Sequence, residues 1–183
     1  INMKKTCFLT ALLFSMFQMH AQVELKSPDQ NLVLKLNNIE KSISFSVWHQ
    51  KDKMISVSEI DLLFDGKTVL ESNKYKPVFS QVKETLIPEV SYKSKEISND
   101  YNQLRLKFKN NLSIEFRAFN DGVAYRFITA TDRQVEVNET AIFQFEDHTK
   151  LWASLTNTYQ TSYEANYSIL NSSDFPDSLI TYL

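Results

Sequence analysis

Apolar and polar residues alternate with a period of two along most of the chain after residue 22. Clear alternation covers residues 32–36, 43–47, 104–109, 112–118 and 123–128, with a further short run at 142–145. Such alternation places one face of a strand on a core and the other toward solvent. No segment after residue 22 sustains the i, i+3, i+4, i+7 spacing of an amphipathic helix. The pattern therefore predicts an all-β chain with little helix.

Turn-forming residues separate these runs. Asn110-Asn111 predicts a tight hairpin with two residues at positive φ, and Asn120-Asp121-Gly122 predicts a second turn with Gly122 in a left-handed conformation. Asp65-Gly66 is a third turn signal. Residues 103–128 are thus predicted to form a three-stranded antiparallel meander, and strands at this spacing favour a sandwich or barrel.

Two stretches lack a clear strand pattern. Residues 76–98 contain Pro77 and Pro88, so we predict a loop or an edge strand there. Residues 171–183 show no strand alternation, and residues 171–174 are typical of a loop. From this we predict a sandwich that is truncated at its C-terminal end.

The first 21 residues have the pattern of a signal peptide. Lys4-Lys5 precede an apolar run, residues 8–17, that is short for a bilayer span, and Ala21 offers a small residue at a cleavage site. We predict a signal peptide at 1–21, a domain at 22–183, and a secreted or periplasmic location. Later apolar runs are also short, so we expect no membrane association after cleavage.

Composition excludes several functional classes. The formal charge is −2, and nucleic-acid binding normally requires a basic excess, so no nucleic-acid partner is expected. One cysteine cannot build a disulfide framework or a multi-thiolate zinc site. Two glycines are too few for a glycine-rich phosphate loop or for a serine nucleophile elbow.

The acidic and imidazole side chains show no spacing that forces a shared site. Glycoside hydrolysis needs two facing carboxylates, and the nearest groupings are Glu139 with Glu146 and Asp147, and Asp121 with Asp132. We predict that these acids lie at solvated strand ends and turns, and that His49 and His148 lie on the surface.

Two further groups each have a structural and a functional interpretation. Arg117 and Arg126 lie on neighbouring predicted strands beside Glu115; they could bind an anion, but a cross-strand ion pair is the favoured interpretation. Aromatic residues also gather around Glu164, either as sugar-stacking faces or as core filler, and a carboxylate among rings would need a cation. These aromatic residues are Trp152, Tyr159, Tyr163 and Tyr167.

Four segments together resemble a known family. Residues 25–29 (Leu-Lys-Ser-Pro-Asp), 93–97, 100–104 and 116–127 look like the N-terminal domain of glycoside hydrolase family 97, in order across most of residues 25–170. The core from Arg117 to Arg126, with Phe119-Asn120-Asp121-Gly122 inside it, is the most specific part. The family includes secreted α-glucosidases and α-galactosidases of Bacteroidetes.

The resemblance implies an antiparallel β super-sandwich similar to galactose mutarotase. In the family this domain packs against a catalytic (β/α)8 barrel that carries the catalytic carboxylates and acts on oligosaccharides. Those residues have no counterpart here, so we predict no catalytic residue and no activity of this chain alone. The resemblance also implies a calcium ion in the full-length enzyme, with Glu164, downstream of Trp152, in the place of one ligand. Calcium takes six to eight oxygen ligands, so Glu164 cannot hold it alone.

Two alternatives stay open. The chain could be a stand-alone carbohydrate-binding sandwich without catalysis. It could also be a decayed gene product, whose unfinished sandwich would expose a sheet edge and aggregate.

Overall fold

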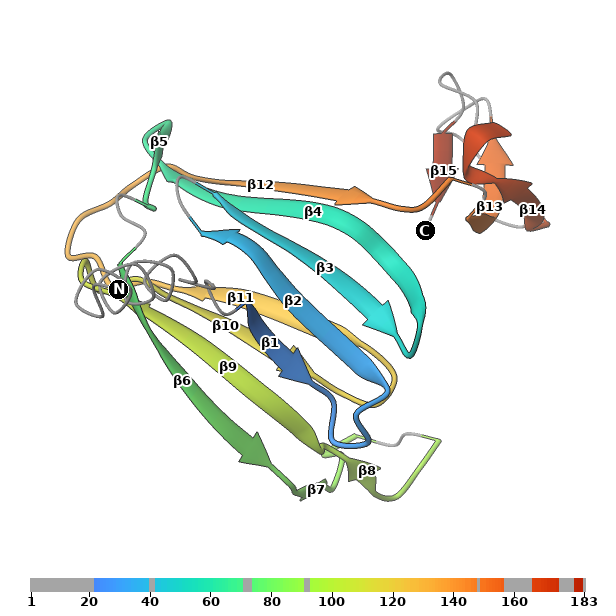
Figure 1. Cartoon of the computed structure of the whole chain (residues 1–183), viewed down its shortest axis with the longest axis horizontal. Helices are drawn as coiled ribbons and strands as arrows, with labels where there is room; N and C mark the ends of the chain where they lie inside the picture. Colours follow the sequence, from blue (N-terminus) through green and yellow to red (C-terminus); the bar gives the residue numbers. More distant parts are fainter. Residues whose placement is uncertain are drawn as a thin grey trace, which may run out of the picture.

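The protein is an antiparallel β-sandwich in which two larger sheets face one another (Figure 1). The computed structural model describes residues 22–39, 42–70, 74–90, 93–147, 149–156, 166–174 and 180–182. Across these residues every strand pairing is antiparallel, and one short 3-10 turn is the only helical element. The predicted all-β antiparallel fold is confirmed, whereas residues 1–21 lie outside the described residues.

The first sheet has the strand order β1-β2-β3-β4-β12, with β5 paired beside β4. Its strands are β1 (Val23–Lys26), β2 (Leu32–Ile39), β3 (Ile43–His49), β4 (Asp52–Phe64), β5 (Lys67–Thr68) and β12 (Val137–Gln144). The even-numbered residues of the run 32–36 and the odd-numbered residues of the run 43–47 point inward, as the alternation predicts. Leu34 and Phe45, for example, are almost fully buried.

The second sheet has the order β11-β10-β9-β6. Its strands are β6 (Tyr75–Val82), β9 (Tyr101–Phe108), β10 (Ser113–Ala118) and β11 (Val123–Ile128). Strands β9, β10 and β11 are consecutive hairpins, which confirms the predicted meander. Pro77 lies in β6 at the edge of this sheet, as the missing backbone donor of proline requires.

The core lies between the inner faces of the two sheets. The inward side chains of β9 and β10 are fully buried, and they pack against the inward residues of β2 and β3. The inward residues of β9 and β10 are Leu104, Leu106, Ile114, Phe116 and Ala118. The Phe45 and Phe116 rings meet edge to face at 5.8 Å between centroids, which joins the two layers by a favourable aromatic geometry.

Strand β12 forms an uncovered margin of the sandwich. Register with β4 places Val137, Glu139, Ala141 and Phe143 on the inner face, yet Val137 and Phe143 are 55% and 46% exposed. Every residue of β12 is exposed. The inner face of β12 is therefore largely open to solvent, and the second sheet contacts it through Tyr125, whose hydroxyl donates to Glu139.

Two small sheets complete the structure. Strands β7 (Thr85–Leu86) and β8 (Ile97–Ser98) form a ribbon, while β13 (Lys150–Thr156) pairs with β14 (Ser168–Asn171) and β15 (Ile180–Tyr182). Figure 1 shows the β13–β15 group set apart from the larger sheets, beyond the end of β12. The 3-10 turn is η1 (Ser172–Asp174).

Two sequence predictions need correction, at β12 and β15, and β4 was not predicted from the sequence. Strand β12 begins at Val137 and not at 142. Its polar first half pairs with β4, but it has no apolar alternation from which the sequence could predict a strand. Strand β4, thirteen residues long, has no uniform alternation because the β3–β4 register shifts twice. Strand β15 lies within 171–183, where no strand was predicted. It is only three residues long and pairs with the distant β13, so it carries no detectable local period.

The turns differ in detail from the sequence expectation. Between β9 and β10 only Asn111 has a positive φ, at 58°, and the Phe108 N–H bonds to the Leu112 carbonyl, so the loop has three residues rather than two. Gly122 does not have a positive φ, so the predicted left-handed conformation at this position is wrong. At the β4–β5 turn both Asp65 and Gly66 have positive φ, as their sequence predicts.

Among the described residues there is no helix long and apolar enough to cross a membrane.

Candidate functional site

The segment 116–127 is divided between core, surface cluster and turn. Phe116 and Ala118 are fully buried in the sandwich core, whereas Arg117 and Arg126 lie on the outer face of the second sheet. Tyr125 faces inward and contacts the rings of Phe45, Phe116 and Phe127. The strand residues of the segment therefore occupy inward or outward positions that the alternation of a strand explains.

The Ser27-Pro28-Asp29 turn and the Asn120 turn are joined in space. The Asp29 N–H donates to Asn120 Oδ1 at 3.0 Å, across 91 residues of sequence. The Ser27 hydroxyl is fully buried, donates to Asp29 Oδ1 at 2.5 Å, and accepts from the Leu32 N–H at 3.0 Å. These bonds hold the β1–β2 turn against the β10–β11 turn, so we call the contact of residues 27, 29 and 120 the turn latch.

Glu115 is a fully buried carboxylate with three arginine partners. Its side chain has 0% exposure, and Arg105 and Arg126 are its direct cross-strand partners on β9 and β11. Arg105 Nε donates to Oε2 at 3.0 Å and its Nη2 contacts the same oxygen; Arg117 Nε and Arg126 Nη2 reach Oε1 at 3.0 and 2.8 Å. Arg117 also lies 4.6 Å from the centroid of the Tyr101 ring. We call Glu115 and its three arginine partners, Arg105, Arg117 and Arg126, the arginine cluster.

The arginine cluster keeps Glu115 ionised. Burial by itself would raise the pKa of the Glu115 carboxyl, but hydrogen bonds from Arg105 and Arg117 and the charge of Arg126 outweigh burial and hold the pKa below its ordinary value. A carboxylate in this state cannot donate a proton near neutral pH. The favoured interpretation of Arg117, Arg126 and Glu115 as a cross-strand ion pair is confirmed, with Arg105 as a third cation.

The other acids singled out by sequence stay apart. Glu139 accepts a hydrogen bond from the Tyr125 hydroxyl at 2.5 Å, and Glu146 pairs with Lys53 at 3.4 Å. Partial burial, followed by the bond to Glu139, raises the pKa of the Tyr125 hydroxyl well above its ordinary value. Asp121 and Asp132 are exposed and occur in none of these contacts. All five of these acids are exposed, as predicted, but Glu139 lies within β12 and not at a strand end or turn.

The aromatic group predicted near Glu164 is only partly described. Trp152 on β13 and Tyr167 before β14 are 65% and 60% exposed, so neither is core filler. Tyr159, Tyr163, Glu164 and His148 lie outside the described residues, while His49 is exposed as predicted. Within the part of the chain that the structure describes, no group of three or more His, Cys, Asp or Glu residues could hold a metal ion.

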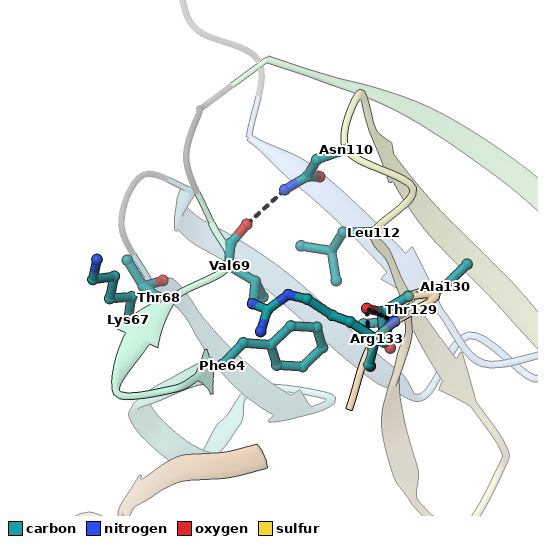
Figure 2. A pocket seen from close by; sticks show the side chains of 10 residues that line it. Phe64, Lys67, Thr68, Val69, Asn110, Leu112, Thr129, Ala130 and Arg133 are labelled. Atoms are coloured by element: carbon teal, nitrogen blue, oxygen red, sulfur yellow. Dashed lines mark hydrogen bonds between the residues drawn. The ribbon is translucent and has the colours of Figure 1, made fainter. Parts of the chain in front are cut away.

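A cleft of about 320 Å³ lies where the β4–β5 turn, the β9–β10 turn and the segment after β11 meet. Figure 2 shows Arg133 reaching across it toward Val69, with the Phe64 ring beside the guanidinium and Lys67 pointing away. Arg133 Nη1 is fixed by Asp65 Oδ2 at 2.7 Å, and this bond lowers the pKa of the Asp65 carboxyl. The cleft thus combines an aromatic ring, hydroxyl groups and a positioned cation.

A second, apolar cleft of about 280 Å³ lies between the sheets at the β12 margin. It is lined by Leu34, Phe45, Ile55, Phe116, Val123, Ala124, Tyr125 and Phe143. The rings of Phe45 and Phe143 are 6.5 Å apart at this point. The cleft continues the uncovered inner face of β12.

Sequence reasoning missed Arg105 and the turn latch. Arg105 could have been found by pairing the two strands of the predicted hairpin, since it lies directly opposite Glu115. The latch bond between Asp29 and Asn120 has no local signal, because its partners are joined only by the packing of the two sheets.

Comparison with known proteins gives concordant results. The family model for the glycosyl-hydrolase 97 N-terminal domain matches residues 25–181. A retaining α-galactosidase of Bacteroides thetaiotaomicron is 33% identical over 129 residues, which are 69% of this chain and 19% of that protein.

Solved structures show the same fold. A glycoside hydrolase family 97 enzyme in complex with acarbose, from Pseudoalteromonas sp. strain K8, matches with a TM-score of 0.64 and 18% identity, over 81% of this chain and 24% of that one. A β-arabinopyranosidase matches with a TM-score of 0.61 and 19% identity, over 80% of this chain and 26% of that one. The chain thus spans about a quarter or less of these relatives. On the family match and the shared sandwich, the chain belongs to the N-terminal domain family of glycoside hydrolase family 97.

Proposed function

We propose that this chain is the non-catalytic N-terminal portion of a secreted family 97 α-glycosidase, and that it supports a separate catalytic barrel acting on oligosaccharides. The observation that carries the proposal is the family match over residues 25–181, combined with coverage of only 19% to 26% of its relatives. The α-galactosidase relative favours an α-galactoside as the substrate class of the whole enzyme, and the family resemblance leaves an α-glucoside as the alternative.

The chemistry of the described acids supports a non-catalytic role. Glycoside hydrolysis needs one carboxyl group that donates a proton and a second carboxylate across the scissile bond. Glu115, the buried acid of the described residues, is held ionised by three arginines, and Glu139 and Glu146 bond to separate partners.

An assay with nitrophenyl glycosides tests the proposal. The purified 183-residue chain should release no nitrophenol from an α-glucoside or an α-galactoside above the buffer rate. Release that scales with protein concentration, and that persists through two orthogonal purification steps, would contradict a non-catalytic role.

We further propose that Glu164 supplies one calcium ligand in the longer enzyme. Support comes from the resemblance of the segment after Trp152 to the family's calcium-binding segment. Because calcium takes six to eight oxygens, the other ligands must come from elsewhere. Calcium titration of this chain by calorimetry should therefore give no saturable binding. Tight binding that is lost in Glu164→Gln would show instead that this chain holds a complete site.

Export is the third part of the proposal. The basic, apolar and small-residue pattern of residues 1–21 supports cleavage after Ala21. Fusing residues 1–21 to a reporter enzyme that is active only outside the cytoplasm should give activity in a Bacteroidetes host. A Lys4→Glu/Lys5→Glu variant should reduce that activity, and equal activity without residues 1–21 would contradict the proposal.

The cleft in Figure 2 favours a second candidate function, which is carbohydrate binding without catalysis. An aromatic face beside a fixed guanidinium and threonine hydroxyls suits a sugar ring with its hydroxyl groups. Calorimetric titration with galactose, glucose and maltose would detect it. Binding that is lost in Arg133→Ala but kept in the control Lys51→Ala, an exposed lysine outside the cleft, would support this candidate. No heat with any sugar would remove it.

A further inference from the structure

The outer face of the second sheet carries a strong positive charge. Alternation and register place Lys76, Arg105, Lys107, Arg117 and Arg126 on this face, and Glu115 is the one acid that the four strands add to it. The face therefore has four excess positive charges, although the whole chain has a formal charge of −2. This face therefore has a net positive charge that the whole chain does not have.

This arrangement is unfavourable in the free chain. Lys76 on β6 lies directly opposite Lys107 on β9, and like charges in that position destabilise a sheet. Both lysines are exposed, and neither has a carboxylate within ion-pair distance among the described residues. An anionic surface placed over this face would relieve the repulsion.

The arginine cluster has unused hydrogen-bonding capacity. Each guanidinium has five N–H donors, whereas one carboxylate offers about four acceptor sites. The two oxygens of Glu115 already receive contacts from all three arginines. Arg126, with its side chain 54% exposed, contacts Glu115 through Nη2. Most of the donors on this face must therefore bond to water or to a partner.

The geometry points to an acidic protein surface as that partner, and we propose that the outer face of β6, β9, β10 and β11 is its docking surface. The charges are spread over neighbouring strands about 4.8 Å apart, which suits an extended surface better than one small anion. Half-buried Val78, Val82 and Ile128 lie among the charges. Arginine with interspersed apolar residues is typical of protein interfaces.

An acidic polysaccharide fits this face less well. Sugar rings pack on exposed aromatic faces, and Tyr101, the ring on this face, is only 6% exposed beneath Arg117. The proposal goes beyond the supporting role inferred from the family, because it rests on the charges of this face alone.

Binding to fluorescent poly-L-glutamate tests the proposal, with polygalacturonate as the glycan comparison. The 183-residue chain should bind polyglutamate. The affinity should fall steeply between 50 and 300 mM salt, because the screening length shortens from about 14 Å to about 6 Å over that range. The Lys76→Glu/Lys107→Glu variant should bind about tenfold more weakly. The control Lys51→Glu/Lys67→Glu, with the same charge change on turns of the first sheet, should keep its affinity.

A melting measurement separates lost binding from lost folding. The single variant Lys107→Glu faces Lys76 with an opposite charge, so it should melt at the same or a higher temperature while binding polyglutamate more weakly. Three results would each overturn the proposal. The first is an equal loss of polyglutamate affinity in the control variant, and the second is lysine-dependent binding of polygalacturonate that is tighter than binding of polyglutamate. The third is a lower melting temperature of Lys107→Glu than of the wild type.

Discussion

The strands β9–β11 and the strand β12 belong to the same sandwich but differ in how their inner faces are covered. Leu104, Ile114 and Phe116 are fully buried, whereas Val137 and Phe143 on β12 are about half exposed. Both regions carry apolar side chains toward the interior. The apolar pattern of a strand therefore predicts which of its faces points toward the core, whereas the burial of that face depends on the elements that lie opposite it.

The same comparison locates the segment that resembles family 97. It occupies β10, β11 and the turn between them, where the core, the turn latch and the arginine cluster meet. These residues hold the closed half of the sandwich together. Their role in the described structure is thus to build and position a domain.

The largest expected effect comes from truncating one inward ring in each region. Phe116→Ala should lower the free energy of unfolding by about 3–5 kcal/mol, because it leaves a cavity in a fully packed site. Phe143→Ala, on the uncovered margin, should cost about 1 kcal/mol because half of its ring is already hydrated. Urea denaturation of both variants measures the difference, and equal losses would break the comparison.

Glu115→Gln should destabilise the closed half by about 2 kcal/mol at neutral pH, because it removes charged hydrogen bonds from three arginines. The pKa of Glu115 is lowered in the folded state, so its contribution is present above the unfolded-state pKa and is lost as the pH falls through the folded-state pKa. The stability gap between wild type and variant should therefore shrink on acidification toward pH 3. A gap that stays constant from pH 7 to pH 3 would contradict this account.

Asn120→Ala tests the turn latch and should cost about 1.5 kcal/mol, because the Asp29 N–H loses its acceptor. The neighbouring Asp121→Ala is the control, since Asp121 is exposed and takes no part in the latch. Thermal melting of both variants compares them. If Asp121→Ala were as destabilising as Asn120→Ala, the effect would belong to the turn in general.

The smallest effect is expected at Asn111, whose φ is 58°. Asn111→Ala should cost about 1 kcal/mol because alanine is strained in the left-handed region, whereas Asn111→Gly should be close to neutral because glycine is not. Chemical denaturation resolves the two. If Asn111→Gly lowered the free energy of unfolding more than Asn111→Ala, the asparagine side chain, and not the backbone conformation, would be the important feature.

Much of the fold was predictable wherever a strand covers a core with regular alternation. This applies to β2, β3 and β9–β11, to Pro77 on an edge strand, and to the ion pair around Glu115. Prediction failed where tertiary pairing decided the structure. The bulged β4, the polar half of β12 and the three-residue β15 have no periodic signal of their own.

The candidate site was less predictable than the fold. The cleft of Figure 2 is formed by the β4–β5 turn, the β9–β10 turn and the segment after β11, which are far apart in sequence. The turn latch joins residues 29 and 120. Neither arises from local spacing. Glu164 and its calcium role stay a prediction, because the residue lies outside the described part of the chain.

Native-state hydrogen exchange tests the central claim most directly, namely that the sandwich has a closed half and an uncovered margin. Amides paired between β9 and β10 should exchange only through global unfolding, while β12 amides paired with β4 should exchange through local opening, orders of magnitude faster. The rates should separate further in Phe143→Ala. Equal protection of β12 and β10 would contradict the account, because it would show that the margin is as firmly packed as the core.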